Sequence, residues 1–459
     1  MSKDSLEMSN QDWDSIVDVQ KTDIVEELAS QIYKEHPDLF NGDKVALGES
    51  INVDYLEQII RQTVLTRKDL LPDEIEEITG KILGQATGYG QLSEFFTGPE
   101  AEEITETMIN PSKDGPKVFV GKHGRPHYVG NHYFKNDQEV KDFVQLHCDK
   151  AGRSFTAESP VVDAWLPDGS RLAAMGYKAC PLGTMITIRK SPVLRPPLPL
   201  SVMVANGTMP QLFSDIAKDL LVPGQCNIGV FGRTDSGKTT LLRALGLFID
   251  PMDRTMIGET SFELFMPNLE NCINVVTVKI GGNEILSMGD ICDSFNRNNP
   301  DRTIVSEIRA GEVVAAAEIA ESTSGGFWTT AHCGSVNQLR SRLPKMFARG
   351  GMTLPRELVD DQIRSMFNYL IFVDKDSMKK RTLMELVQVT DDDYRPIIRF
   401  DKEEYALTRG KTRRWIYENP ISNKGLADLG FRGGTIKPEY EKVIGNGYLY
   451  AADQGGVQC

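Results

Sequence analysis

The sequence predicts a doubly wound α/β core with a mainly parallel sheet, preceded by an α+β domain and a helical N-terminal extension. Strand and helix patterns alternate after residue 200, and short strands and turns prevail between about residues 102 and 190. Before residue 98, apolar residues recur at helical spacing. The chain has 459 residues, enough for two or three domains, and its 40% hydrophobic content is ordinary for globular proteins.

We divide the chain into five parts from these patterns. In chain order they are an acidic helical extension (1–98), an α+β domain (99–191), a proline-rich linker (192–200), the α/β core (201–400) and a C-terminal appendage of short helices and turns (401–459). The prolines make the linker stiff. In the extension, Ile24, Leu28 and Ile32 recur every four residues and predict an amphipathic helix. A second helical stretch contains Ile75, Ile78, Ile82 and Leu83.

The elements of the two folded domains follow from the same patterns. In the α+β domain, residues 117–121 and 185–188 are predicted strands, and 167–169 is a Pro-Asp-Gly turn. The predicted helices of the core are 210–221, one from 238, 312–322 and 337–348. The predicted strands of the core are 227–231, 255–257, 274–279, 303–305, 327–331 and, as the last strand, 369–374.

Residues 232–239 fit the phosphate-loop pattern G-x-x-x-x-G-K-[ST] between the strand at 227–231 and the helix from 238. Backbone N–H groups of such a loop point at an anion, and the helix N-terminus adds positive potential. Lys238 is expected to reach the β- and γ-phosphates of ATP, and the Thr239 hydroxyl to coordinate Mg²⁺. The predicted nucleotide-binding residues here are Gly232, Arg233, Thr234, Asp235, Ser236, Gly237, Lys238, Thr239 and Thr240.

Asp235 stands in the middle of this loop, where a small neutral residue is usual. A carboxylate near a triphosphate is unfavourable unless it turns to solvent or pairs with a base such as Arg233. Aspartate tolerates left-handed backbone better than most residues, which is compatible with the loop geometry.

Nucleotide hydrolysis also needs a carboxylate for the metal or the attacking water. Glu307 stands at the carboxyl end of the strand predicted at 303–305, about 70 residues after the loop, and is the predicted catalytic and metal-binding residue. Glu259, Glu263 and His332 lie at the ends of other predicted strands. We expect the two glutamates to help hold the metal or polarise water, and His332 to sense the γ-phosphate by hydrogen bonding. Arg309 is a further cation for the developing charge.

Composition excludes several classes of protein. No run of 18 apolar residues predicts a membrane span, and the acidic N-terminus lacks the apolar region of a secretory signal. The seven cysteines are scattered singly, which favours reduced thiols in the cytoplasm and no zinc ribbon. A net charge of −14 disfavours stable nucleic-acid binding.

Three further segments resemble a known family. Residues 103–110, 159–172 and 186–190 are similar to the N-terminal domain of the secretion-ATPase superfamily, which drives type II secretion, type IV pili and conjugation. The chain most resembles the CpaF-like branch, which powers Tad pili, from about residue 75 to 395. The resemblance implies a RecA-like motor core and a hexameric ring. It places Glu259 and Glu263 in the acidic box, Glu307 in the Walker B box and His332 in the histidine box.

The chain departs from the family pattern at three positions. Asp235 replaces a loop glycine, Thr260 stands where the acidic box often has aspartate, and Ser306 replaces a glycine before Glu307. We expect these changes to affect turnover more than nucleotide binding. The absence of a cysteine ribbon agrees with the CpaF-like and conjugative branches.

The resemblance also places the N-terminal domain over the nucleotide. Arginine binds phosphate oxygens through a planar fork and stays charged, so it suits this contact. We expect Arg171 and Arg189, rather than Arg153, to touch the nucleotide. The alternative is that these arginines lie on the surface or pair with carboxylates such as Asp163 or Asp168.

These observations lead to one predicted function and two alternatives. The predicted function is an ATP- and Mg²⁺-dependent homo-hexameric motor that assembles a Tad or type IV-like pilus, or secretes protein. It would work at the inner face of the cell membrane with an inner-membrane platform protein. The alternatives are a conjugative traffic ATPase and a non-catalytic nucleotide-binding scaffold. The basic segment 409–415 is either a docking patch for the platform or lipid or, as we favour, a solvated turn.

Overall fold

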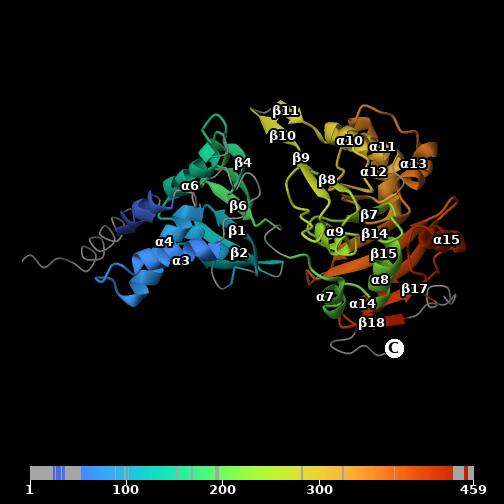
Figure 1. Cartoon of the computed structure of the whole chain (residues 1–459), viewed down its shortest axis with the longest axis horizontal. Coiled ribbons are helices and arrows are strands. Elements are labelled where there is room, and N and C mark those ends of the chain that lie inside the picture. Colours follow the sequence, from blue (N-terminus) through green and yellow to red (C-terminus); the bar gives the residue numbers. More distant parts are fainter. Residues whose placement is uncertain are drawn as a thin grey trace, which may run out of the picture. The chain divides into compact units, whose positions relative to one another are not determined.

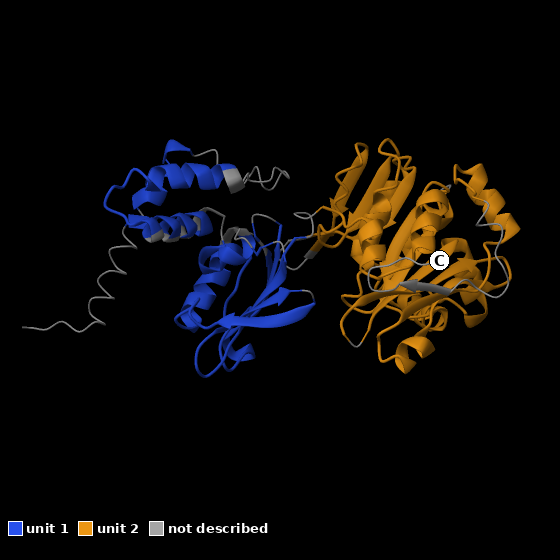
Figure 2. Cartoon of the chain, turned by 90° about the horizontal axis from the view of Figure 1, so that it is seen from below, with its two compact units in different colours: residues 1–194 blue, residues 195–459 orange. Residues whose placement is uncertain are grey.

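The computed structural model describes the chain from residue 24 to residue 452, with gaps at 26, 33, 37–52, 88, 98–99, 102, 123, 151–152, 167–168, 192–195, 281–282, 323–324, 377 and 438–448. It divides into two compact units, residues 1–194 and 195–459 (Figure 2). The division falls inside the segment predicted as a linker.

The first unit begins with a small helical layer. Helical residues between 24 and 35 pack with α3 (Val53–Val64) and α4 (Pro72–Thr87), and Leu28, Ile60 and Ile78 are buried between them. The apolar residues at helical spacing face this shared core, which confirms the two predicted amphipathic helices. The short helices η2 (Gly90–Leu92) and α5 (Glu94–Thr97) follow.

A six-stranded antiparallel sheet completes the first unit, in the order β3-β2-β1-β6-β5-β4. Its strands are β1 (Ile104–Asn110), β2 (Lys117–Lys122), β3 (Arg125–Gly130), β4 (Val161–Trp165), β5 (Arg171–Met175) and β6 (Met185–Arg189). Alternate residues of the strands form a core with α6 (Asp137–Lys150), and the intervening residues are partly or fully exposed. The strands predicted at 117–121 and 185–188 are confirmed.

The second unit is built on a ten-stranded sheet, six strands of which run parallel in the order β14-β7-β13-β12-β8-β9. These strands are β7 (Ile228–Gly232), β8 (Thr255–Glu259), β9 (Cys272–Val276), β12 (Arg302–Val305), β13 (Phe327–Ala331) and β14 (Tyr369–Lys375). The central strands β7, β8, β12 and β13 are buried along their whole length, as expected for a parallel sheet covered on both faces. The strand predicted at 274–279 is in fact two strands, β9 and β10 (Val278–Ile280), and β10 forms a separate hairpin with β11 (Asn283–Leu286).

Helices cover both faces of this sheet through two separate hydrophobic cores. One core includes α7 (Leu200–Ala205), α8 (Gln211–Ile216), the π-turn Ala217–Leu221 and α9 (Lys238–Gly246). The other includes α10 (Met288–Asn296), α11 (Glu312–Ser322), α12 (Val336–Arg349) and α13 (Val359–Met366), which stand together in Figure 1. This arrangement confirms the doubly wound α/β prediction.

Four antiparallel strands extend the sheet beyond β14, so the prediction that the strand at 369–374 is the last one is wrong. They are β15 (Arg381–Val389), β16 (Tyr394–Phe400), β17 (Arg413–Tyr417) and β18 (Leu449–Ala452). The region predicted as an appendage does contain the short helices α14 (Lys402–Leu407) and α15 (Asn423–Phe431), but β17 belongs to the core sheet. β17 was not predicted because it begins with two arginines, which interrupt the alternation of apolar and polar residues expected for a strand.

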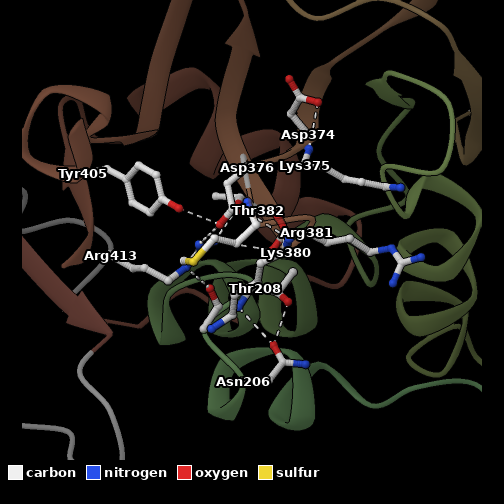
Figure 3. A network of polar contacts seen from close by, with 12 residues as sticks. Asn206, Thr208, Asp374, Lys375, Asp376, Lys380, Arg381, Thr382, Tyr405 and Arg413 are labelled. Carbon is white, nitrogen blue, oxygen red and sulfur yellow. Dashed lines mark hydrogen bonds and ion pairs between the residues drawn. The ribbon is translucent and has the colours of Figure 1, made fainter. Parts of the chain in front are cut away.

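The basic segment 409–415 is a solvated turn only in its first part, where Arg409 and Lys411 are exposed in a turn, because the side chains of Arg413 and Trp415 face inward. Trp415 is fully buried and donates from its indole N–H to the carbonyl of Leu383. Arg413 pairs with Asp376 at 2.7 Å, and both side chains are only 6% exposed. Figure 3 shows Arg413 among Asp376, Thr382 and Tyr405. Arg413 and Trp415 therefore contribute to the interior of the second unit.

We predict that Arg413→Met destabilises the second unit by about 3–5 kcal/mol, because it leaves the buried Asp376 carboxylate without its cation. Arg414→Met is the matched control: Arg414 is 28% exposed and pairs with Asp401, so its loss should cost about 1 kcal/mol or less. Denaturant unfolding of the full chain measures both. Equal small effects would contradict a structural role for the Arg413 pair.

Candidate nucleotide-binding and catalytic site

The phosphate-loop sequence forms the connection between β7 and α9, as predicted. β7 ends at Gly232, α9 begins at Lys238, and Gly237 caps the helix with a left-handed φ of 92°. Two glycines are sterically required: side chains are strained at the Gly237 φ, and a Cβ at Gly232 would lie 2.2 Å from the carbonyl oxygen of Val373. The loop thus combines a strand end with a helix N-terminus, which is the geometry of an anion site.

Lys238 folds back over the loop. Its ammonium donates to the carbonyls of Gly232 and Arg233, both at 3.1 Å, and to the Nδ1 of His332 at 3.2 Å. The residue is 8% exposed. A buried ammonium beside helical N–H groups concentrates positive charge at the mouth of the loop.

Parallel pairing brings three predicted catalytic residues to the same sheet edge. Glu307 follows β12 and His332 follows β13, the strand between β12 and β7. His332 Nε2 lies 2.9 Å from the Glu307 carboxylate, and Arg309 lies 2.5 Å from the other carboxylate oxygen. Lys238, His332, Glu307 and Arg309 therefore form one continuous polar chain from the loop to the end of β12.

The protonation of His332 follows from its neighbours. Nδ1 of His332 lies 3.2 Å from the Lys238 ammonium, which can only donate, and 3.3 Å from the carbonyl oxygen of Gly232, whereas Nε2 faces Glu307. Burial and the charge of Lys238 lower the pKa of His332, although Glu307 opposes them. The imidazole is therefore neutral at neutral pH and lies between Lys238 and Glu307 without adding charge.

The two carboxylates of the predicted acidic box lie in different settings. Glu259, the last residue of β8, is fully buried, and its carboxyl accepts from the backbone N–H groups of Glu263 and Leu264. Burial raises the pKa of Glu259 to about 8, so it is largely protonated at neutral pH. Glu263 is partly exposed. The pKa of Arg309 is raised mainly by the hydrogen bond that Arg309 donates to Glu307, and the negative charge of Glu263 raises it further. Glu263 thus lies nearer the polar chain, whereas Glu259 organises the backbone after β8.

Asp235 has a left-handed φ of 58° and pairs with cations from outside the loop. Its carboxylate contacts the Lys375 ammonium and accepts from Arg381 at 2.8 Å. Burial would raise the pKa of Asp235, but these two bonds outweigh it and lower the pKa below its usual value. Arg233, the partner expected from the sequence, instead pairs with Asp374 at 2.8 Å.

The remaining predicted loop residues lie along the same connection. Ser236 is buried, and its hydroxyl has no hydrogen-bond partner among the residues that the structure describes. Thr239 lies half-buried in the first turn of α9, while Thr234 and Thr240 are exposed. The serine hydroxyl and the first helical turn are thus available to a ligand of the loop.

Sequence reasoning missed Lys375, Arg381 and Asp374. All three belong to the β14–β15 hairpin, about 140 residues from the loop that they contact. The sequence shows only that these residues lie at or just after the end of the strand predicted at 369–374, and this does not indicate a contact with the loop. The pairing of β14 with β7 brings them beside the loop.

The predicted arginines of the N-terminal domain lie in the first unit. Arg171 and Arg189 are exposed and directly opposite each other on β5 and β6. Arg171 pairs with Asp163 at 3.2 Å, one of the two carboxylates named as alternatives; the other, Asp168, lies outside the described residues. Arg153 lies in the loop after α6, away from these strands in sequence.

Comparison with known proteins identifies the class. Residues 104–408 match the family described as Type II/IV secretion system protein, so the chain belongs to this family. It is 31% identical over 226 residues to the type IV secretion system protein VirB11 of Brucella suis, covering 44% of this chain and 62% of VirB11. An uncharacterized Methanocaldococcus jannaschii protein is 29% identical over 214 residues, 46% of this chain and 38% of that protein.

Among solved structures, the Legionella pneumophila ATPase DotB is 17% identical, with 66% of this chain and 81% of DotB covered and a TM-score of 0.47. The chain spans less than two thirds of the length of either sequence relative. The family match confirms the secretion-ATPase superfamily implied by the sequence motifs. No described helix combines the length and apolar character needed to cross a bilayer.

The buried carboxyl of Glu259 leads to a prediction on pH. With a folded pKa near 8, its stabilising neutral form is fully present below the ordinary pKa of 4.5 and is lost as the pH rises through 8. The free energy of unfolding should thus fall with a slope of up to about 1.4 kcal/mol per pH unit between these values. Glu259→Gln stays neutral and should flatten this slope, whereas Glu263→Gln should not. Melting temperatures between pH 5 and 8 test this, and parallel profiles for all three proteins would contradict it.

Proposed function

We propose that this chain hydrolyses ATP at the loop between β7 and α9 and uses the energy for mechanical work in a secretion or pilus system. The observation that carries the proposal is the polar chain Lys238–His332–Glu307–Arg309 beside a phosphate loop. A glycine-rich turn with a purely structural role would not need a carboxylate at a strand end that is linked to the lysine of the turn. A phosphoryl-transfer site needs both the lysine and the carboxylate, because the charge of the γ-phosphate must be neutralised and the attacking water must be positioned.

The loop residues fit a Mg²⁺-nucleotide. The buried hydroxyl of Ser236, orphaned among the described residues, and the open start of α9 supply the donors that phosphate requires. Lys238 would neutralise the β- and γ-oxygens, and Thr239 would hold Mg²⁺, which supplies the charge neutralisation of phosphoryl transfer. Glu307 would orient water or the metal, His332 would report the γ-phosphate to Glu307, and Arg309 would restrain the Glu307 carboxylate. Glu263 would extend this acidic surface, and Glu259 would fix the backbone that carries it.

The arginine pair of the first unit supports a second part of the proposal. Arg171 and Arg189 are exposed and opposite each other on neighbouring strands, so they present two cations side by side. The ion pair of Arg171 with Asp163 is about 45% exposed on each side, so its loss to a phosphate would cost little. We propose that this unit closes on the nucleotide and that the pair binds phosphate in a homo-hexameric ring. Release of that contact after hydrolysis would be the power stroke.

For the cellular role we propose assembly of a Tad or type IV-like pilus, or protein secretion, by a CpaF-like motor. The partner would be an inner-membrane platform protein, and the motor would work on the cytoplasmic side, peripherally at the membrane. The motif at 159–172 and the helical extension support this role. The alternative, a conjugative traffic ATPase, is supported by the similarity to VirB11. A non-catalytic scaffold is the second alternative, because Asp235 departs from the loop pattern.

Substitutions of Lys238 and Glu307 separate either motor from the non-catalytic scaffold. Lys238→Ala should weaken ATP binding by roughly ten- to a hundredfold, because a charged hydrogen-bond donor is lost. Glu307→Gln should bind ATP normally and hydrolyse it about 10²- to 10⁴-fold more slowly, because the ground state does not need the carboxylate. Calorimetry and phosphate release measure the two steps. Binding without turnover in the wild-type protein would favour the scaffold.

The arginine pair is tested in the full chain. Arg171→Ala and Arg189→Ala should each lower ATP turnover by about tenfold while leaving the free energy of unfolding nearly unchanged, because both side chains are exposed. Arg125→Ala, an exposed arginine on β3, is the matched control and should have no effect. Wild-type turnover in both variants would contradict a nucleotide contact by this unit.

A further inference from the structure

Asp235 combines a left-handed backbone conformation with a negative charge beside a loop that binds anions. Its φ of 58° is a conformation that glycine adopts without strain, yet the position carries a carboxylate at the mouth of an anion-binding loop. Both carboxylate oxygens are used: one contacts Lys375, and the other accepts from Arg381. The carboxylate therefore holds two cations that belong to neither β7 nor α9.

The geometry keeps these cations at the loop. Lys375 ends β14 and Arg381 begins β15, and they are opposite each other in the hairpin. The Arg381 side chain crosses the loop, since a Cβ at Gly237 would lie 3.0 Å from the Arg381 Cδ. Its Nε is buried and has no partner within the described part of the chain. Arg381 therefore has donor capacity left beside the residue that caps α9.

The rest of the hairpin is anchored from behind. Arg413 donates to Asp376 and Thr382, and Asp376 also accepts from Tyr405. In Figure 3, Lys375 and Arg381 extend to the side opposite Tyr405 and Arg413. The backbone that carries the two cations is thus fixed, and their side chains can change partner by rotation alone.

We propose that Lys375 and Arg381 are phosphate ligands of this site and that Asp235 is a built-in anion that holds them until phosphate arrives. The inference rests on the proposed nucleotide site. It adds Lys375 and Arg381 as phosphate ligands, and Asp235 as a carboxylate that competes with phosphate for them. A triphosphate carries several charges where Asp235 carries one, and the arginine fork binds phosphate oxygens bidentately. The Asp235–Arg381 pair is about 40% exposed on each side, so its loss costs little. The exchange then favours polyphosphates over weaker anions.

A double-mutant cycle tests the exchange. Asp235→Asn keeps a side chain that tolerates left-handed backbone but removes the competing charge. We expect it to bind a non-hydrolysable ATP analogue with Mg²⁺ roughly fivefold more tightly, the scale of one exposed ion pair. Arg381→Gln should weaken binding, and it should do so by a larger factor in the Asp235→Asn background, where Arg381 no longer leaves a partner. Lys375→Gln should behave in the same way.

The competing explanation is that the two cations only brace Asp235. In that case Arg381→Gln and Lys375→Gln would have no effect once Asp235 is asparagine, and this result would overturn the proposal. Arg399→Gln is the matched control: Arg399 is 45% exposed and pairs with Glu418 in the same unit, and its replacement should leave binding unchanged. Lys238→Ala identifies the other possible failure. If it binds the analogue normally, the nucleotide site itself is misassigned; if it loses binding while the cycle shows no Arg381 effect, only the exchange is refuted.

Discussion

The hydrogen-bonded register of β7 with its two parallel neighbours is the constraint on which the site depends. β13 lies on one side of β7 and β14 on the other, so their carboxyl ends open at the same edge as the phosphate loop. His332 arrives from one side, and the β14–β15 hairpin arrives from the other. A shift of one residue in either pairing would turn these side chains to the opposite face of the sheet. The full burial of β7 and β13 fixes that register.

Local sequence patterns predicted the elements that carry the site. The helix at 312–322 and the strand at 327–331 have the predicted bounds, and Lys238, His332 and Glu307 lie together as their strand-end positions imply. Such elements are predictable because periodicity and glycine placement are local properties. The glycines of the loop were informative for the same reason, since φ and close approach depend on a few neighbouring atoms.

Long-range electrostatics could not be predicted in this way. The partner of Asp235 was expected to be its neighbour Arg233, whereas two cations about 140 residues away hold it. The burial of Arg413, at the end of the basic segment 409–415, was missed for a related reason: it depends on Asp376, which only the folded sheet brings near. A charged residue in a sequence is normally predicted to be exposed to solvent. It can be buried when the fold supplies an oppositely charged partner, which the local sequence does not show.

The wide sequence separation within the site has a consequence for synthesis of the protein. The loop leaves the ribosome well before the hairpin that supplies Lys375 and Arg381, because about 140 residues separate them. Contacts this distant form late, after the local β14–β15–β16 meander has been made. A nascent chain that has reached only the end of α9 has neither neighbour of β7. The proposed nucleotide site is therefore complete only after the β14–β15 hairpin has been translated.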